Sequence, residues 1–98
     1  MQNKKKEIGD KDIHQHIFAR MQQRGVTKDE IQIVLNEGWD AKDCKSGTCG
    51  KVMNFQYQME WEGKFFEEKE VTVYYKVREE MLVLLTVKAR YGQFKKEG

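Results

Sequence analysis

The sequence has no proline, only two cysteines and no long apolar run. With 98 residues and no proline-rich linker, the chain has room for a single domain over residues 1–98, because a second core would need more chain. No stretch approaches the roughly 20 apolar residues of a membrane-spanning helix. The opening residues, MQNKKKEIGDKD, also lack the apolar run of a signal peptide. We therefore expect a soluble cytoplasmic protein with no membrane partner.

The two cysteines, Cys44 and Cys49, enclose the polar loop Lys-Ser-Gly-Thr. A structural disulfide is disfavoured in a cytoplasmic protein. A zinc site would have to combine this pair with His14 and His16. However, the C-x4-C spacing exceeds the common C-x2-C knuckle, and a helix directs side chains two residues apart about 200° from each other. We expect free thiols, no metal and no cofactor.

The chain also lacks a strong net charge. Its formal charge is +2, so no overall field indicates a nucleic acid as the partner, and such a partner must be argued from how the charges are distributed. Aromatic residues are frequent, at 11% of the chain, and their large side chains supply a core for so short a domain. We expect an ordered core over about residues 10–92, with flexible ends at 1–9 and 93–98.

The first part of the chain has helical spacing. Ile13, Ile17 and Met21 recur every four residues, which predicts an amphipathic helix over about residues 12–24. We expect Asp10 or Asp12 to be its N-cap or first-turn acid. Gly25 then supplies the residue that ends this helix.

A second helix is predicted over residues 28–37. Thr27 and Glu30 match a capping box, and Val26 and Ile31 match the flanking hydrophobic staple. Ile31 also begins the expected buried stripe, which continues with Val34 and Leu35, and Gly38 ends the helix.

The second half of the sequence alternates with a period of two, which predicts strands. The segment KVMNFQYQMEW has one expected core face, and EVTVYYKV has another. The expected core residues are Met53, Phe55, Tyr57, Met59, Trp61, Val71, Val73, Tyr75 and Val77. The fold class is therefore α+β, with two N-terminal helices on one face of a three-stranded, or possible four-stranded, antiparallel sheet in the order ααβββ.

The last predicted strand, MLVLLTVKAR, begins apolar on both faces, which suits a central strand. Towards its end Thr86, Lys88 and Arg90 share one face, whereas Val87 and Ala89 share the other. With Tyr91 directly after it, this segment forms a basic cluster that contains an aromatic residue. Such clusters are typical of proteins that bind single-stranded RNA.

The first predicted helix carries a second basic feature. His16, Arg20 and Arg24 fall at i, i+4 and i+8 and form a ridge on one side of the helix. In the simplest interpretation this ridge is only the solvated side of an amphipathic helix. In the functional interpretation it binds phosphate, because guanidinium groups form paired hydrogen bonds with phosphate oxygens. His14 is expected on the opposite side of the helix and outside any cluster.

The sequence leaves two functions open for these residues, beside that of an ordinary structural or interaction protein that docks through an exposed strand edge. If the ridge and the strand cluster met in one groove, His16 could transfer protons in metal-free RNA cleavage, with Arg20, Arg24, Lys88 and Arg90 contacting phosphate and Tyr91 stacking a base. The same residues equally suit a module that binds RNA, a nucleotide or a partner protein without turnover. The catalytic interpretation requires that the two clusters face each other.

From His16 to Val26 the chain reads H-x-x-x-R-M-x-x-R-G-V, and the capped helix after it ends in VLNEG. Together with the closing LLTVKAR, this pattern resembles the domain-of-unknown-function 4258 family of small bacterial and phage-associated proteins over about residues 12–91. The resemblance implies a fold similar to RelE/BrnT-like toxins, which cleave RNA without a metal, and a cognate antitoxin as a protein partner. It places His16, Arg20 and Arg24 in the family's motif and Lys88 and Arg90 on its closing strand. Ile17 stands where the family commonly has alanine, and the CKSGTCGK and EGKFFEEKE segments are longer than is typical.

Overall fold

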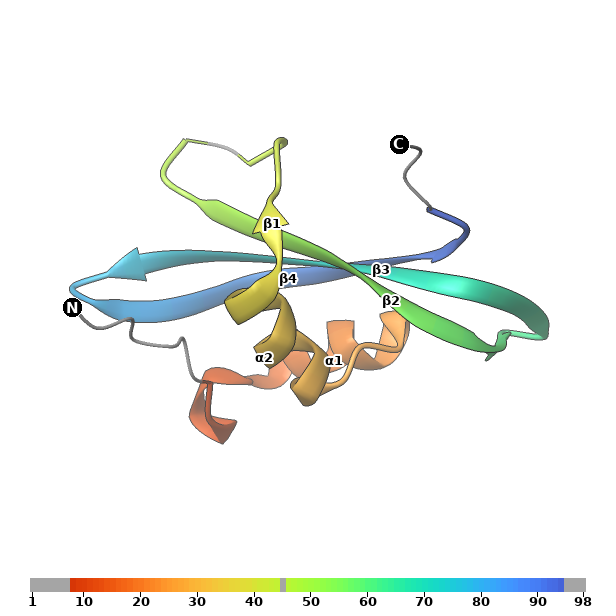
Figure 1. Ribbon diagram of the computed structural model, residues 1–98. Coiled ribbons are helices and arrows are strands. Elements are labelled where there is room, and N and C mark those ends of the chain that lie inside the picture. Colours follow the sequence, from red (N-terminus) through yellow and green to blue (C-terminus); the bar gives the residue numbers. More distant parts are fainter. Residues whose placement is uncertain (1–7, 45, 95–98) are drawn as a thin grey trace.

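The computed structural model describes residues 8–44 and 46–94 and confirms the α+β class. A short 3-10 turn (Asp10–Asp12) leads into two helices, α1 (Gln15–Arg24) and α2 (Lys28–Glu37). Four strands follow: β1 (Trp39–Asp40), β2 (Cys49–Trp61), β3 (Lys64–Arg78) and β4 (Met81–Gly92). They form one antiparallel sheet in the order β1-β2-β3-β4, with both helices on the same face (Figure 1).

The core lies between the helices and one face of this sheet. Pleating alternates the side chains of each strand, so every second residue along Val71–Tyr75 of β3 points at the helices, as do Leu84 and Val87 of β4 on either side of an irregularity in the β3–β4 pairing. The helices contribute the apolar stripes that their spacing predicts. The fully or nearly fully buried residues include Ile17, Met21, Ile31, Val34, Leu35, Val71, Val73, Tyr75, Leu84 and Val87. We call this side of the sheet the helix-covered face and the opposite side the open face.

Helix α1 begins later than the sequence pattern predicts. Its N-cap is His14, whose backbone is extended (φ −78°, ψ 176°) and whose side chain makes no capping hydrogen bond. Asp12 is not the cap, because its carboxylate accepts a hydrogen bond from the Gly9 N–H at 2.8 Å within the preceding turn. Asp10 also lies in that turn. The prediction of an aspartate N-cap was therefore wrong, although Gly25 does end the helix, in a left-handed conformation with φ 73°.

Helix α2 has the predicted boundaries. The Glu30 N–H donates to Thr27 Oγ1 at 3.1 Å, and the Thr27 N–H donates to Glu30 Oε1 at 3.0 Å, which completes the capping box. At the other end, Gly38 passes so close to β2 that a Cβ there would lie 2.5 Å from the carbonyl oxygen of Val52. The missing side chain lets α2 continue directly into the sheet.

Two expected core residues of the strands are exposed instead. The pairing of β2 with β3 shifts between Gln56 and Met59, where Gln58 has φ 47°. This irregularity re-aims the end of β2, and Met59 is 54% exposed. Val77 is 58% exposed because it lies near the β3–β4 turn.

The last strand also differs from expectation in its place in the sheet. β4 is an edge strand rather than a central one, since the meander places the final strand at the margin. Helix α1 packs along it. The apolar start of the strand, Met81–Leu84, lies beside Lys11, Asp12 and His14 of the N-terminal turn. The apolar start of β4 thus lies beside the N-terminal turn rather than beside a further strand.

Ordered contacts extend beyond the expected core at both ends. Ile8 is buried, and its N–H donates to Gln32 Oε1 at 3.0 Å. Gln93 and Phe94 both make hydrogen bonds to acidic side chains of β3. The rest of the expected flexible ends, residues 1–7 and 95–98, lies outside the described residues. Within the part that the structure describes, no helix is both long enough and apolar enough to cross a membrane.

Candidate functional site

The sheet separates the two basic clusters that the sequence indicates. Val87 is buried against the helices, so pleating directs Lys88 and Arg90 to the open face. Their partners across β3 are Thr72 and Glu70. The ridge residues belong to α1, which packs on the helix-covered face. His16 and the two β4 cations therefore do not line a common groove.

On α1 the ridge itself is present. His16 is exposed, whereas Arg20 and Arg24 are half-buried. The Nε of Arg24 is enclosed and has no hydrogen-bond partner among the described residues. The helix contains no acidic residue, so its outer side is positively charged.

His14 lies next to His16, contrary to the prediction that the two rings point apart. Their ring centroids are 6.1 Å apart and the ring planes differ by 14°, so the imidazoles are stacked. The prediction assumed that both residues are helical. Because His14 is the extended N-cap, the helical angle between positions two apart does not apply. His14 also borders a hollow of about 260 Å³ that Lys11, Asp12 and Met81–Leu84 complete.

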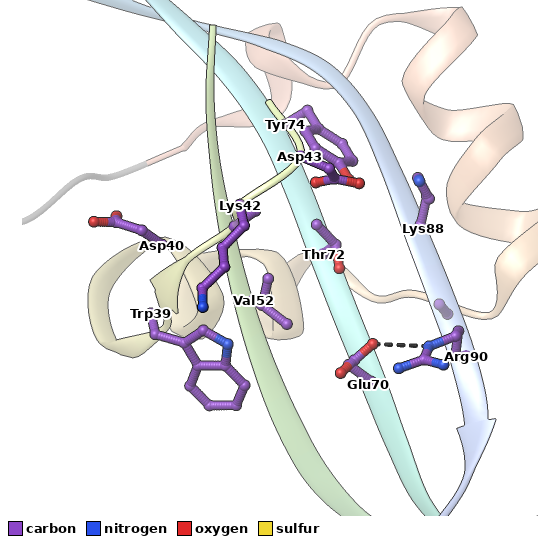
Figure 2. A pocket seen from close by; sticks show the side chains of 12 residues that line it. Trp39, Asp40, Lys42, Asp43, Val52, Glu70, Thr72, Tyr74, Lys88 and Arg90 are labelled. Atoms are coloured by element: carbon purple, nitrogen blue, oxygen red, sulfur yellow. Dashed lines mark hydrogen bonds and ion pairs between the residues drawn. The ribbon is translucent and has the colours of Figure 1, made fainter. Parts of the chain in front are cut away.

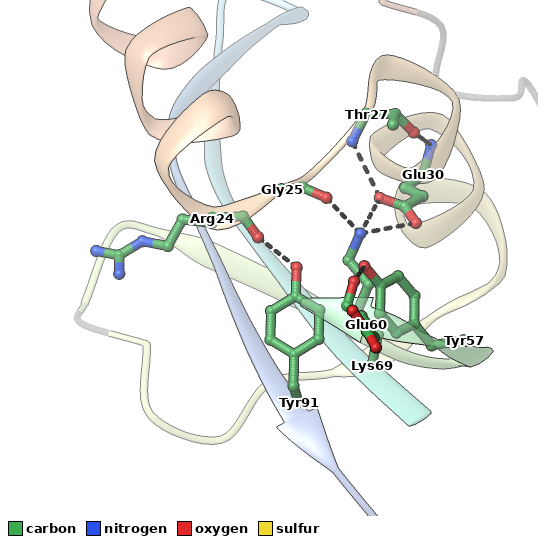
Figure 3. A network of polar contacts seen from close by, with 8 residues as sticks. All are labelled: Arg24, Gly25, Thr27, Glu30, Tyr57, Glu60, Lys69 and Tyr91. Atoms are coloured by element: carbon green, nitrogen blue, oxygen red, sulfur yellow. Dashed lines mark hydrogen bonds and ion pairs between the residues drawn. The ribbon is translucent and has the colours of Figure 1, made fainter. Parts of the chain in front are cut away.

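The side chain of Tyr91 makes contacts within the molecule through both its hydroxyl and its ring. Its hydroxyl donates to the carbonyl oxygen of Arg24 at 2.6 Å, which ties β4 to the end of α1 (Figure 3). Trp61 stacks on its ring at 4.9 Å between centroids, and Tyr57 contacts it edge-on at 5.3 Å. Burial, followed by the neighbouring Tyr57 and Glu30, raises the pKa of Tyr91 far above its ordinary value. This ring is not available to stack a nucleic-acid base.

Lys69 completes the same cluster from β3. Its side chain is 3% exposed, and its amine donates to both carboxylate oxygens of Glu30, at 2.8 and 3.0 Å, and to the carbonyl oxygen of Gly25 (Figure 3). The amine also lies 5.5 Å from the Tyr57 ring centre and 5.7 Å from the Tyr91 ring centre. These contacts join the α1–α2 corner to the sheet and identify a structural cluster rather than a ligand site.

The open face carries the larger concave surface, which we call the sheet hollow. It measures about 390 Å³ and is lined by β1, the loop after it, one residue of β2, and β3 and β4. Figure 2 shows Trp39 and Lys42 on one side of this hollow and Lys88 and Arg90 on the other. Val52 and Thr72 form part of its floor. Trp39 is 48% exposed, so about half of its indole surface is open to solvent.

The residues that line the sheet hollow balance formally in charge, with three cations (Lys42, Lys88, Arg90) and three acids (Asp40, Asp43, Glu70), although the Asp40 carboxylate points away from the hollow (Figure 2). Each acid has a partner. Glu70 binds Arg90 Nε at 2.9 Å, Asp40 binds Lys51 at 2.7 Å, and Asp43 accepts from the Tyr74 hydroxyl at 3.0 Å. The amines of Lys42 and Lys88 form no ion pair among the described residues. They carry the positive charge that the hollow presents.

Tyr74 holds Lys88 and Asp43 in place at one end of the hollow. The Lys88 amine lies 5.2 Å from the centre of the Tyr74 ring, an attractive cation–π contact. Burial, together with the hydrogen bond to Asp43, raises the pKa of Tyr74, so its hydroxyl remains a donor at neutral pH. Alternation in EVTVYYKV could have placed Glu70, Thr72 and Tyr74 opposite the core residues. No sequence signal indicates Trp39, because β1 has only two residues.

No family model, curated protein or solved structure matches this chain. The resemblance over residues 12–91 therefore rests on the quoted sequence pattern alone. The cysteines are free thiols, Cys44 half-buried and Cys49 exposed at the start of β2. Among residues 8–44 and 46–94, no three His, Cys, Asp or Glu side chains come together in a way that would hold a metal ion.

Proposed function

We propose that this protein binds single-stranded RNA on the open face of its sheet, without turnover. The observation that carries the proposal is the sheet hollow, in which an exposed indole faces lysine and arginine side chains across the strands. Trp39 stacks one base, and the Lys42 and Lys88 amines contact the backbone phosphates. Stacking on a protein side chain requires an unpaired base, so single strands are bound in preference to duplexes.

Binding is measured by the fluorescence anisotropy of a short, fluorescein-labelled oligouridylate. Trp39→Ala is expected to weaken binding by about 5-fold or more, since one base–aromatic stack contributes about 1–3 kcal/mol. Lys88→Ala is expected to lower the slope of log affinity against log salt by about 0.7, the value for one phosphate contact on a single strand. Lys64→Ala removes the same charge from the exposed first residue of β3 and is the matched control.

A direct readout is also available, because the chain has two tryptophans and only Trp39 lies in the hollow. In Trp61→Phe the remaining indole reports the site alone, and RNA is expected to quench its fluorescence. Binding that is unchanged in Trp39→Ala and insensitive to salt contradicts the proposal.

The stacked histidines favour a second candidate function, metal-free RNA cleavage on the helix layer of the ribonuclease-toxin type. One imidazole would accept the proton of a 2′-hydroxyl, and the other would give a proton to the leaving 5′ oxygen. Arg20 and Arg24, on the same helix, would stabilise the negative charge that develops on phosphorus oxygens. Arg20, at i+4, is a surface neighbour of His16, and Arg24 continues the same side of the helix at i+8, which supports this role.

This second function is tested by incubating the protein with RNA in the presence of a metal chelator. Cleavage is expected to disappear in both His14→Ala and His16→Ala and to persist in Gln15→Ala, which alters the exposed residue between them. RNA that stays intact with the wild-type protein, or that is cut equally by His16→Ala, rules out catalysis by this pair.

A further inference from the structure

Phe94 folds back from the end of β4 onto the open face, directly beside the sheet hollow. Its ring lies 4.7 Å from the Arg90 guanidinium carbon. Its N–H donates to Glu68 Oε1 on β3, and its carbonyl oxygen accepts from Asn54 Nδ2 on β2 at 3.5 Å. Phe94, two residues after the end of β4, is thus held across three strands, over the same face that carries Lys88 and Arg90.

Arg90 is oriented for stacking. Glu70, only 19% exposed, binds its Nε at 2.9 Å and fixes the plane of the guanidinium, while the Arg90 side chain itself remains 67% exposed. A guanidinium plane stacks on any flat aromatic ring, and nucleobases stack on arginine in the same way as phenylalanine does. The ring of Phe94 therefore occupies a position that a nucleobase could take.

A polar atom nearby lacks the partner that a base could supply. Asn54 lies opposite Glu70 on β2, in the same row as Arg90. Its Oδ1 is buried and accepts no hydrogen bond from any described residue. Buried acceptors of this kind are costly unless a donor reaches them. An exocyclic amino group, present on adenine, cytosine and guanine but not on uracil, is such a donor.

We infer that Arg90 and Asn54 form a second base-binding subsite, and that Phe94 occupies it in the free protein and leaves it when RNA binds. The inference rests on the proposed RNA-binding function of the open face. One base stacks on Trp39 and a second on Arg90, and bases that carry an amino group are preferred at the second position. Phe94 is an internal competitor whose removal strengthens binding.

The ring of Phe94 can leave the subsite by rotation of its side chain, while its N–H keeps the hydrogen bond to Glu68. The hydrogen bond of Phe94 with Asn54 is at the upper limit of length, and its ring interaction is with an exposed arginine. Such an exposed cation–π contact is among the weaker ones. The ring can therefore exchange with a base without disturbing the core, which lies on the other face of the sheet.

The experiment compares the affinity of the full chain and of Phe94→Ala for labelled oligocytidylate and oligouridylate. Phe94→Ala is expected to bind oligocytidylate about 2- to 5-fold more tightly, the factor that corresponds to losing an exposed cation–π competitor. The gain is expected to vanish in the Arg90→Lys background, which keeps the charge but loses the stacking plane. Phe65→Ala removes another exposed ring, 58% exposed on β3, and serves as the control.

The possible outcomes distinguish failure of the second base-binding subsite from failure of RNA binding itself. Tighter binding by Phe94→Ala, dependent on Arg90, supports the subsite. Wild-type binding with an unchanged or weaker affinity in Phe94→Ala overturns the inference and leaves the proposed function standing. The absence of binding by both proteins, to either oligonucleotide, overturns the proposed function and the inference with it.

Discussion

The buried ion pair between Lys69 and Glu30 allows a quantitative prediction about stability. In Lys69→Met the amine is lost and an apolar chain of similar length remains. Removing one partner of a buried pair typically costs about 3–5 kcal/mol, because the other charge is left uncompensated. Here the Glu30 side chain is 20% exposed and keeps its hydrogen bond from the Thr27 N–H, which places the cost near the lower end. We expect a loss of about 3 kcal/mol in the free energy of unfolding.

The assay is urea denaturation followed by circular dichroism, with thermal unfolding as a second measurement. For a domain of 98 residues, about 3 kcal/mol corresponds to a fall in Tm of about 12–24 °C. The double variant Lys69→Met/Glu30→Gln removes the uncompensated charge as well. It is expected to recover most of the loss, because apolar or neutral replacements of a whole buried pair are often nearly neutral.

Lys64→Met makes the same chemical change at an exposed position and is expected to alter stability by no more than about 0.5 kcal/mol. The reasoning is refuted if Lys69→Met unfolds within about 1 kcal/mol of the wild type. It is also refuted if the double variant is no more stable than the single one, since the cost would then not arise from the charge left on Glu30.

Three further changes test other parts of the structure. Because the pKa of Tyr91 is raised in the folded protein, its contribution to stability is complete below its unfolded pKa of about 10 and is lost as the pH rises beyond it. When unfolding is measured between neutral and alkaline pH, Tyr91→Phe is therefore expected to lose less stability at alkaline pH than the wild type. At neutral pH the same substitution costs about 1 kcal/mol for the lost hydrogen bond. Gly25→Ala is expected to lower Tm strongly, because φ is 73° and the new Cβ would lie 2.6 Å from the Trp61 ring. A Tm near the wild-type value would show that the α1–α2 corner relaxes freely. Thr27→Ala removes the cap of α2 and is expected to cost about 1 kcal/mol in urea denaturation, whereas Thr86→Ala, on a strand, should have no effect on the helix.

Local signals in the sequence predict the fold well where they act within one element. The capping box of Thr27 and Glu30 fixes the start of α2, and alternation identifies the faces of β3 and the end of β4. These patterns depend on neighbouring residues only. The start of α1 was missed because Asp12 accepts a hydrogen bond from the backbone of Gly9, and local side-chain–backbone bonds of this kind compete with helix capping.

The candidate site was less predictable, since its parts come from distant segments. The alternation of β4 correctly groups Lys88 with Arg90, but it does not say which side of the sheet the helices cover. Trp39 enters the site through a strand of two residues that pairs with β2, and such a pairing leaves no periodic pattern. The stacking of His14 on His16 depends on a single extended residue at the helix start.

The hydrogen bond from Tyr91 to Arg24 has a consequence for how the chain acquires its structure. It joins residues 67 positions apart, and the bonds of Lys69 to Glu30 and Gly25 span 39 and 44 positions. Loops of this length close slowly, because the chain loses conformational entropy before the stabilising contacts have formed. During synthesis α1 and α2 emerge first but have no lasting place to dock until β3 and β4 have followed. The helix pair is thus made before the strands but is locked in place only after β4 has followed.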